Sequence, residues 1–200
     1  MTKTLEFWFD FSSPYAYLAA QKIDDLAARA GRETLWRPFL LGVVFGVTGN
    51  GPLTRQPIKG DYTRHDLERM ARYMDVDWHM PDKFPIPTQH AARAFYWIDK
   101  DDPDTAKKFA RVAFNAYFAR NIDISPAQTV LNIAAGCNVD PDVLGPALQT
   151  PEAKQALRDR TDEAMKKGVC GSPFFIVDGE GFWGSDRMWM VKKWMQQGGW

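Results

Sequence analysis

The chain has 200 residues, of which 45% are apolar and 25% are charged, and its 25 acidic residues balance its 25 basic residues. This composition is typical of one globular domain, or of a domain with a sizeable insertion. The zero net charge argues against nucleic acid as a partner, because such binding needs an excess of basic residues.

The first part of the chain has the pattern of a β-α-β unit. Residues 4–10 form an aromatic, apolar run typical of a buried strand. Residues 14–30 have the apolar spacing of an amphipathic helix, which Gly31 would close. Residues 33–38 predict a second strand that ends at Pro38. The helical crossover makes the two predicted strands parallel.

Ser13 and Pro14 lie where the first strand passes into the helix. Proline suits the first turn of a helix, and a serine beside it can accept a hydrogen bond from a free backbone N–H. The same position would also stabilise an anion such as a thiolate or a carboxylate. From this segment alone, a helix cap is the simpler explanation.

Residues 39–60 are rich in Gly and Pro, with Gly49-Asn50-Gly51-Pro52 at their centre. They predict a long loop, which is either functional or a flexible linker. From about residue 62 to residue 167 the pattern is helical, and no strand interrupts it. Thr63 is a candidate helix cap, Phe84-Pro85-Ile86-Pro87 predicts a rigid connector, and helices are predicted over 89–98 and 104–120. Ser125-Pro126-Ala127-Gln128 predicts a capping box, with proline at the first helical position, for a helix that ends at Gly136. A short helix is predicted from Asp140, and a further helix from Thr150-Pro151-Glu152 to Lys167.

Strand patterns return near the end of the chain. Residues 172–177 predict a strand, Asp178-Gly179 a tight hairpin turn, and residues 181–183 the partner strand. Ser185-Asp186-Arg187 then opens a last helix that runs to about Gln196, so this part reads β-β-α.

These patterns together predict an α/β fold with a thioredoxin-like core of one four-stranded mixed sheet and a large all-helical insertion. Residues 1–40 and 168–200 would form the thioredoxin-like domain, and residues 41–167 the loop and helical insertion domain. The corners Ser13-Pro14 and Ser172-Pro173 are then expected to meet above the strand ends, where such folds bind ligands.

The two cysteines, Cys137 and Cys170, lie far apart and form no C-x-x-C. We expect free thiols, although the spacing leaves a disulfide open. The three histidines have no metal-site spacing with the cysteines, so no metal is predicted. No segment has the ~20 apolar residues of a membrane span and no secretory signal precedes the first strand, so we expect a cytoplasmic protein without a membrane partner.

Five segments occur in an order that resembles a known family: Asp10-Phe11-Ser12-Ser13-Pro14-Tyr15-Ala16-Tyr17-Leu18, Gly49-Asn50, Lys59-Gly60-Asp61-Tyr62, Gly171-Ser172-Pro173, and Phe182-Trp183-Gly184-Ser185-Asp186-Arg187. Together they resemble the 2-hydroxychromene-2-carboxylate isomerases and the kappa-class glutathione transferases. Both groups are related to the Dsb-type disulfide oxidoreductases, and the resemblance covers essentially the whole chain.

The resemblance implies glutathione as the cofactor. The oxidoreductases carry C-x-x-C where this chain has Ser13-Pro14-Tyr15-Ala16, so dithiol exchange has no thiol to use here. In the glutathione-using relatives, the serine equivalent to Ser13 donates a hydrogen bond to the glutathione sulfur. Ser13 is thereby the implied catalytic residue, since hydrogen bonds to a thiolate lower the pKa of the thiol.

The implied cofactor-binding residues are Ser13, Pro14, Tyr15, Asn50, Ser172, Pro173, Ser185 and Asp186. The family also implies a cis bond between Ser172 and Pro173, with the serine backbone facing the peptide-like cofactor. Asp186 would pair with the γ-glutamyl amine and Ser185 with the adjacent carboxylate. Ser185-Asp186 also fits a plain helix cap, and Asn50 also fits a simple turn residue.

Lys59, Tyr62 and Phe84 are the residues implied on the substrate side, where a lysine would suit a carboxylate. A solvated lysine and a core phenylalanine remain the alternatives. Pro87 stands where many of the isomerases have an asparagine, so the substrate pocket is expected to differ from theirs.

The function implied is a glutathione-dependent cis-trans isomerase of aromatic catabolism. It would interconvert 2-hydroxychromene-2-carboxylate and trans-o-hydroxybenzylidenepyruvate, or a close analogue. The alternatives are a kappa-like glutathione transferase or peroxidase, and a non-catalytic glutathione-binding module. The relatives are commonly dimers, so a homodimer acting on a small aromatic molecule is expected.

Overall fold

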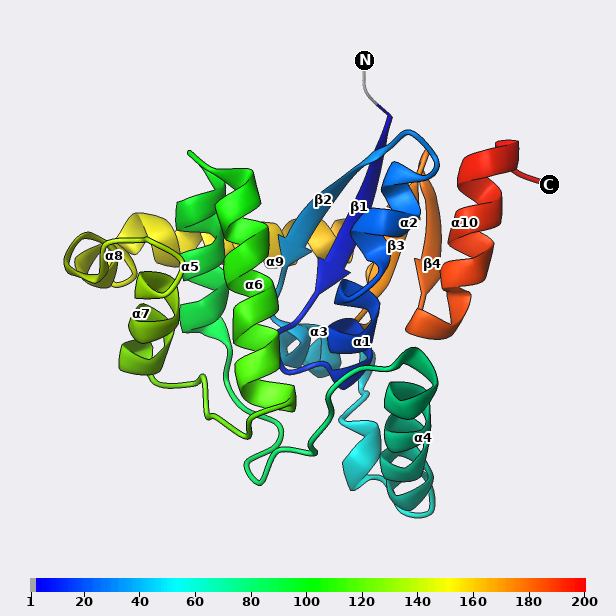
Figure 1. The fold of residues 1–200 in the computed structure, drawn as a ribbon, viewed down its shortest axis with the longest axis horizontal. Coiled ribbons are helices and arrows are strands. Elements are labelled where there is room, and N and C mark those ends of the chain that lie inside the picture. Colours follow the sequence, from blue (N-terminus) through cyan, green and yellow to red (C-terminus); the bar gives the residue numbers. More distant parts are fainter. Residues whose placement is uncertain (1–2) are drawn as a thin grey trace.

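A four-stranded mixed sheet forms the centre of the computed structural model, which describes residues 3–200 (Figure 1). Its strand order is β2-β1-β3-β4. The strands are β1 (Thr4–Phe9), β2 (Glu33–Pro38), β3 (Phe174–Val177) and β4 (Glu180–Trp183). β1 runs parallel to β2 and antiparallel to β3, and β4 runs antiparallel to β3. The predicted mixed sheet and thioredoxin-like order are confirmed.

Helices fill the chain between β2 and β3, and the described residues contain no further strand there, as predicted. The helical elements are α1 (Pro14–Ala20), α2 (Ile23–Ala28), α3 (Leu41–Thr48), the short 3₁₀ turn η1 (Leu53–Arg55), α4 (Lys59–Met74), α5 (Gln89–Asp99), α6 (Pro103–Phe118), α7 (Ala127–Ala135), α8 (Pro141–Ala147), α9 (Pro151–Lys166), the 3₁₀ turn η2 (Ser185–Arg187) and α10 (Met188–Gln197).

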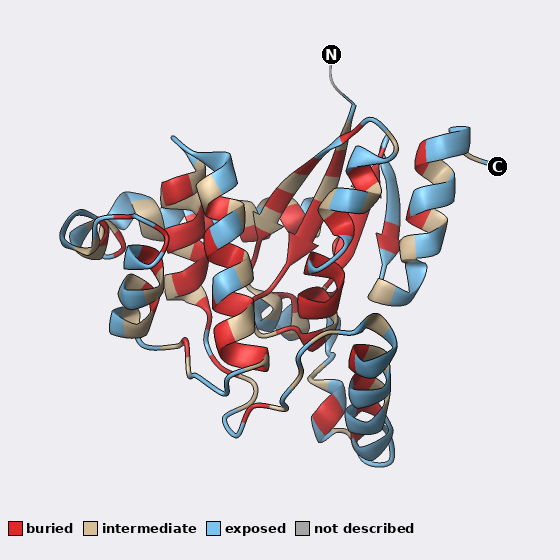
Figure 2. Cartoon of the chain, viewed as in Figure 1, coloured by how far each residue is buried: buried red, intermediate tan, exposed pale blue. Residues whose placement is uncertain are grey.

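The side chains of β1 alternate between two packed faces of the sheet, as the geometry of a strand requires. Phe7 and Phe9 belong to the larger core cluster, which includes residues of α1, α5 and α6. Trp8 points the other way, into a smaller cluster with Phe39 and with Ala164 of α9. Figure 2 accordingly shows buried residues along the sheet and on the inward sides of the helices around it. Burial on both faces explains why this strand is almost wholly apolar.

Phe9 joins the sheet to the helical stretch. Its ring lies 5.4 Å from the ring of Trp36 in β2, 6.0 Å from Phe95 in α5 and 5.4 Å from Phe114 in α6, measured between centroids. All four side chains are buried in one cluster. The hydrophobic core is therefore continuous between the segments that the sequence divides into a thioredoxin-like domain and an insertion.

The single helix predicted over residues 14–30 is wrong, because the chain breaks it into α1 and α2. The backbone N–H of Gln21 donates to Leu18 O, three residues back, instead of continuing the four-residue pattern. Leu18 and Ile23 are both fully buried. In an unbroken helix they would point about 140° apart. The break turns both side chains toward the core.

The long loop predicted over residues 39–60 is also wrong, since α3 occupies much of it and α4 begins at Lys59. α3 buries only Val44, so its own apolar pattern does not identify it. Thr63 does not cap α4. It lies inside that helix, and its hydroxyl donates to Lys59 O at 2.7 Å.

The capping box predicted at Ser125 does not form. The hydroxyl of Ser125 donates to Asp123 instead, and Pro126 lies just before α7 rather than in its first position. The helices predicted to start at Asp140 and at Thr150 are confirmed, and each of these side chains caps its helix by accepting a hydrogen bond from a backbone N–H of the helix.

The predicted turn at Asp178-Gly179 is confirmed, and a half-buried ion pair attaches it to the residue that precedes β2. Both residues have positive φ, as a tight hairpin turn requires. Arg32, which precedes β2, donates two hydrogen bonds of 2.9 and 2.7 Å to the carboxylate of Asp178. The Arg32 side chain is buried, whereas the Asp178 side chain is 44% exposed.

Asp178→Asn should lower the free energy of unfolding by about 1–2 kcal/mol at pH 7, because it leaves a buried guanidinium without its anion. Asparagine tolerates the positive φ at this position, so the turn itself should persist. The hydrogen bonds from Arg32 hold the pKa of Asp178 below its usual range. The contribution of the pair is therefore present at neutral pH and is lost as the pH falls through that lowered pKa.

Urea unfolding of the wild type and of Asp178→Asn, compared between pH 7 and about pH 3, measures this effect. Asp101→Asn is the control, because Asp101 is exposed and makes no ion pair with a described residue. An equal stability of wild type and Asp178→Asn at pH 7 would contradict the prediction.

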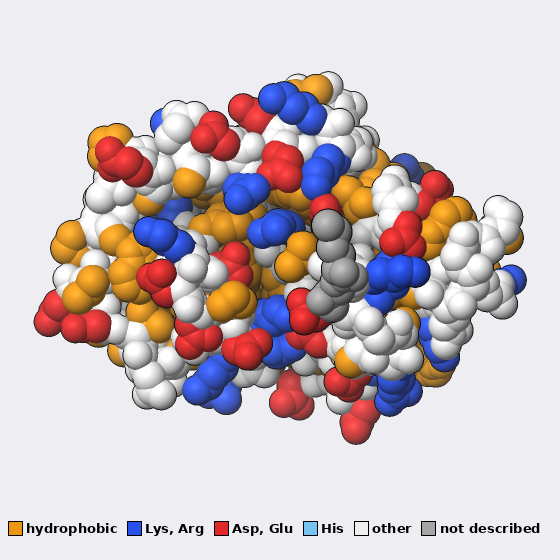
Figure 3. Space-filling view, turned by 90° about the horizontal axis from the view of Figure 1, so that it is seen from above, with side chains coloured by type: hydrophobic (Ala, Val, Ile, Leu, Met, Phe, Trp, Pro, Cys, Tyr) orange, Lys and Arg blue, Asp and Glu red, His pale blue; other side chains and the backbone are white. Residues whose placement is uncertain are grey.

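The molecular surface is mixed in charge. On the face seen in Figure 3, acidic and basic side chains lie side by side around apolar ones. Within residues 3–200, none of the helices has the length and hydropathy that a membrane crossing requires.

Candidate functional site

The two serine-proline corners meet, as the sequence predicts. The hydroxyl of Ser13 donates to Ser172 O at 2.8 Å, although 159 residues separate them along the chain. The backbone N–H of Asp10 donates to the hydroxyl of Ser172 at 2.9 Å. The Ser172-Pro173 bond is cis, which the family resemblance implies. These contacts place the β1–α1 corner against the start of β3.

Ser13 is also the cap of α1. Its hydroxyl oxygen accepts a hydrogen bond from the N–H of Ala16 at 3.2 Å, and Pro14 takes the first helical position. Ser13 is only 4% exposed. The backbone N–H of Tyr15, in the same turn, has no partner among residues 3–200. The cap and the binding site are thus compatible, since this turn keeps one free donor next to the Ser13 hydroxyl.

Asp10 lies at the base of this corner and is a residue that sequence reasoning passed over. Its carboxylate accepts hydrogen bonds from the N–H of Ser12 at 2.8 Å, the N–H of Leu41 at 2.8 Å and the hydroxyl of Thr88 at 2.9 Å. Burial raises the pKa of Asp10, and these three hydrogen bonds oppose that rise. The side chain is therefore a buried acceptor that joins three segments of the chain.

Ser185 and Asp186 form η2, which packs against α1 and so lies beside the Ser13 corner. Neither side chain caps a helix, so the plain helix-cap interpretation is not realised. The carboxylate of Asp186 pairs instead with its neighbour Arg187 at 2.7 Å. Asp186 is exposed and Ser185 is half-buried.

The hydroxyl of Tyr15 points toward α4. It donates to the carboxylate of Asp66 at 3.0 Å, and Asp66 also pairs with Arg69. Burial raises the pKa of Tyr15 well above its usual range, and the nearby carboxylate of Asp66 raises it further. The guanidinium of Arg69 lies 5.8 Å over the ring of Tyr62, so Tyr62 belongs to the same polar network. Lys59 is exposed at the first position of α4.

Phe84 reaches the site through the connector that follows α4. It is half-buried, it precedes a cis proline at Pro85, and its carbonyl accepts a hydrogen bond from Arg55. Two residues later, the N–H of Ile86 donates to the hydroxyl of Ser12 at 3.1 Å. Pro87, the departure from the family pattern, is exposed beside this contact.

Asn50 is a predicted cofactor residue that no described hydrogen bond joins to the corner. It is exposed in the connection between α3 and η1, and its side-chain amide donates to the hydroxyl of Thr48 at 3.2 Å. The contacts of Asn50 are therefore those of a simple turn residue, the alternative to cofactor binding.

Both cysteines are free, as expected. Cys137 is buried, which raises the pKa of its thiol, and Cys170 is half-buried next to the smaller core cluster. Among the described residues, no group of His, Cys, Asp or Glu is arranged to hold a metal ion.

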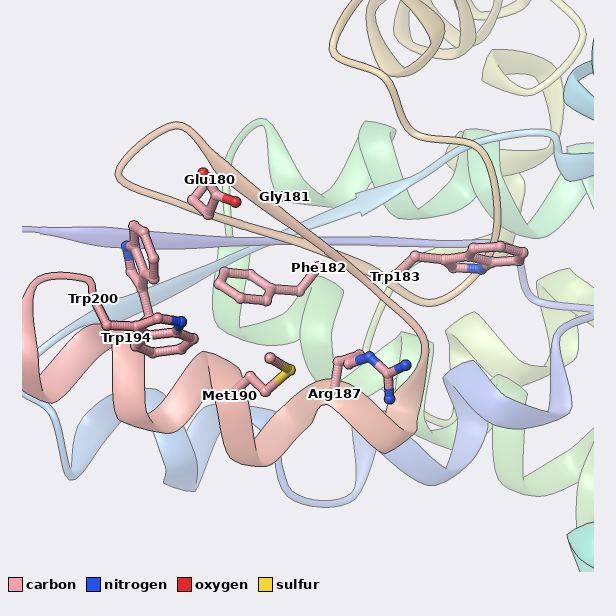
Figure 4. A pocket seen from close by; sticks show the side chains of 8 residues that line it. All are labelled: Glu180, Gly181, Phe182, Trp183, Arg187, Met190, Trp194 and Trp200. Atoms are coloured by element: carbon pink, nitrogen blue, oxygen red, sulfur yellow. The ribbon is translucent and has the colours of Figure 1, made fainter.

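A separate groove of about 480 Å³ lies between β4 and α10 (Figure 4). Its lining residues are Glu180, Gly181, Phe182, Trp183, Arg187, Met190, Trp194 and Trp200. None of the predicted site residues lines it. The Arg187–Asp186 pair links it to the candidate site, and so does Trp183, whose ring lies against Gly171.

Comparisons with known proteins agree with this fold. A model of the DSBA-like thioredoxin domain matches residues 4–196. The 2-hydroxychromene-2-carboxylate isomerase of Sphingobium xenophagum is 33% identical over 94% of this chain and 95% of its own length. Glutathione S-transferase kappa 1 of Homo sapiens is 26% identical, over 98% of this chain and 94% of the relative. A solved 2-hydroxychromene-2-carboxylate isomerase is 26% identical and matches with a TM-score of 0.87, covering 96% of this chain and 94% of that one.

Proposed function

Because the chain belongs to the 2-hydroxychromene-2-carboxylate isomerase family, whose members share the DSBA-like thioredoxin domain, we propose that it is a glutathione-dependent cis-trans isomerase. The proposed reaction interconverts 2-hydroxychromene-2-carboxylate and trans-o-hydroxybenzylidenepyruvate, or a close analogue, in aromatic catabolism. The observation that carries the proposal is the Ser13 hydroxyl at the meeting of the two corners. A serine and an alanine stand there in place of a cysteine pair.

The residues at this corner fit a bound thiolate. A thiolate needs hydrogen-bond donors, and the free N–H of Tyr15 lies in the same turn as the Ser13 hydroxyl. The Ser13 hydroxyl now donates to Ser172 O and can turn to a closer, charged acceptor. Both donors favour the ionised form of a thiol and so lower its pKa.

Glutathione, when bound, supplies the nucleophile that adds reversibly to the substrate's double bond and permits rotation about it. Ser13 holds the sulfur at the base of the site. Ser172 and Pro173 present the cis corner to the peptide part of the cofactor. Ser185 and Asp186, beside α1, face its γ-glutamyl end, and Asn50 completes the site through the α3–η1 connection.

The substrate side of the site is assigned to α4 and the connector that follows it. Lys59 makes no ion pair with any residue from 3 to 200, so its charge is free to meet a substrate carboxylate. Tyr62 lies one turn further along α4, and Phe84 offers an aromatic edge from the connector. Pro87 removes a polar side chain at the position where many isomerases carry an amide, which would alter the choice of substrate.

Purified protein should convert 2-hydroxychromene-2-carboxylate at a rate that rises with glutathione concentration and then saturates. The total amount of glutathione should stay constant, because the cofactor leaves each cycle unchanged. Absorbance of the substrate and chromatography of glutathione measure the two quantities. Equal turnover with and without glutathione would refute the mechanism.

The same assay separates the alternatives. The similarity to kappa-class transferases favours a glutathione transferase or peroxidase as the second candidate, and that activity would consume glutathione. A non-catalytic binding module would bind glutathione without converting any electrophile. The proposal also includes a cytoplasmic homodimer with a small aromatic substrate and no nucleic-acid or membrane partner.

A further inference from the structure

Asp10 lies in the β1–α1 corner, and three segments that are distant in sequence converge on it. Its carboxylate receives the N–H of Ser12 from the β1–α1 corner, the N–H of Leu41 at the start of α3, and the hydroxyl of Thr88 before α5. Its backbone N–H donates to the hydroxyl of Ser172 beside the cis proline. The segments around Ser12, Leu41, Thr88 and Ser172 are thereby attached at one residue, whereas η2 and α4 are not.

Asp10 is also bonded directly to Ser13. The backbone N–H of Ser13 donates to Asp10 O at 2.9 Å. Asp10 is thus bonded to the backbone of Ser13 and to the side chain of Ser172, the two serines that meet at the corner. On the far side, Leu41 opens α3, and α3 leads to Asn50, nine residues after Leu41. Asp10 is therefore hydrogen-bonded both to the Ser13–Ser172 corner and to the start of the helix that leads to Asn50.

The surroundings of Asp10 suit a carboxylate and not a carboxamide. One oxygen accepts from Ser12 and Thr88, and the other accepts from Leu41. All three partners are donors at 2.8–2.9 Å, and the side chain is 6% exposed. An amide placed here would set its NH₂ group against at least one of these donors, which leaves a buried donor unpaired.

We propose that Asp10 is the positioning residue of the glutathione site, fixing the Ser13–Ser172 corner and the start of α3 in one arrangement through its hydrogen bonds. This inference rests on the proposed function. Asp10 is buried beneath the corner and acts through its neighbours rather than on the reacting atoms. Its effect is expected in binding and turnover, because displacements of about 1 Å at a catalytic constellation lower rates strongly.

Three substitutions test the role. Asp10→Asn removes the acceptor for one donor and should raise the Kd for glutathione about tenfold. Thr88→Val removes one hydrogen bond to the Asp10 carboxylate and should raise the Kd for glutathione about threefold. Thr88→Ser keeps the hydroxyl and should bind glutathione as the wild type does. Calorimetry with reduced glutathione, at a temperature where circular dichroism finds each variant folded, measures the Kd.

Thr161→Val is the matched control. Thr161 is as buried as Thr88, and its hydroxyl accepts a hydrogen bond from the N–H of Leu40, next to Leu41, without touching Asp10. It should lower the melting temperature but leave the Kd for glutathione unchanged. A merely structural role for Asp10 would give the same result for Thr88→Val as for Thr161→Val, with lower stability and unchanged binding.

The outcomes distinguish this inference from the function on which it rests. If the wild type does not bind glutathione, the proposed function fails and the inference fails with it. If the wild type binds but Asp10→Asn and Thr88→Val bind equally well, only the inference is overturned. Weakened binding in both variants, restored by Thr88→Ser, supports it.

Discussion

Ser13→Ala is expected to lower glutathione-dependent turnover about 100-fold, the loss typical of removing one hydrogen bond that stabilises a developing or bound anion. The Ser13 hydroxyl is a donor at the meeting of the two corners. Without it, the thiol of glutathione should ionise at higher pH, so the pH at which turnover reaches half its maximum should rise. Initial rates measured from about pH 5 to pH 9 give both quantities.

The substitution also removes a helix cap, so a control for that loss is needed. Thr150 caps α9 in the same way, accepting from the N–H of Ala153 at 3.1 Å, and belongs to no proposed site. Thr150→Ala and Ser13→Ala should each cost about 1 kcal/mol of stability from the lost cap, but only the second should lose activity.

Ser13→Cys provides a second arm of this experiment. The new thiol should react with oxidised glutathione, forming a mixed disulfide at the corner and releasing one glutathione thiolate. Mass spectrometry detects the added glutathionyl group. Full activity in Ser13→Ala, or no adduct in Ser13→Cys, would remove Ser13 from its proposed role.

Phe9→Ala is expected to lower the free energy of unfolding by about 3–5 kcal/mol, the usual cost of deleting a fully buried phenylalanine. The melting temperature should fall by roughly 6–20 °C, since each kcal/mol corresponds to about 2–4 °C in a chain of this size. The ring contacts Trp36 of β2, Phe95 of α5 and Phe114 of α6, so the cavity opens between the sheet and the helical stretch.

The shape of the transition matters as much as its midpoint. Because one core cluster spans both segments, calorimetry should give a single transition for the wild type and for Phe9→Ala. Tyr73→Ala is the control, since that aromatic side chain is 87% exposed and should change stability by less than about 0.5 kcal/mol. Two separated transitions would instead support independent folding of residues 41–167, the domain division that the sequence predicts.

Much of the fold could be predicted because its signals are local. Asp178-Gly179 forms the hairpin turn that its dipeptide predicts, and Thr150-Pro151 opens α9 as its spacing indicates. The aromatic run of β1 identifies a buried strand without reference to its neighbours. In each case the decisive hydrogen bond or backbone preference involves residues within about four positions of one another.

The errors arose where distant contacts decide the local structure. α3 is a helix without an amphipathic pattern, because nearly all of its residues are apolar or glycine. The N–H of Leu41 at its start donates to the carboxylate of Asp10, which lies 31 residues earlier. Thr63 resembles a cap, yet α4 begins four residues before it and uses its hydroxyl inside the helix. The predicted helix over 14–30 breaks so that both of its halves face the core.

The candidate site divides in the same way. Ser13, Ser172 and the η2 residues could be placed from sequence, because the resemblance extends along the whole chain and the strand order brings their corners together. Asp10 lies within one of the five segments that resemble the family, but its residue type and position alone predict no function for it. Thr88, its hydroxyl partner, is 78 residues away and carries no signal of its own.

The sequence by itself determined that four strands form one mixed sheet, that a strand-free helical stretch separates their two pairs, and that Ser13 and Ala16 replace both corner cysteines. These follow from periodicity, turn chemistry and residue identity, which neighbouring residues specify. Only the tertiary structure decided which polar groups meet: that Ser13 donates to Ser172, and that one buried carboxylate at Asp10 joins the surrounding segments. The physical reason is that a buried acceptor must be satisfied by whichever donors the packed chain brings to it, and periodicity within the sequence does not specify them.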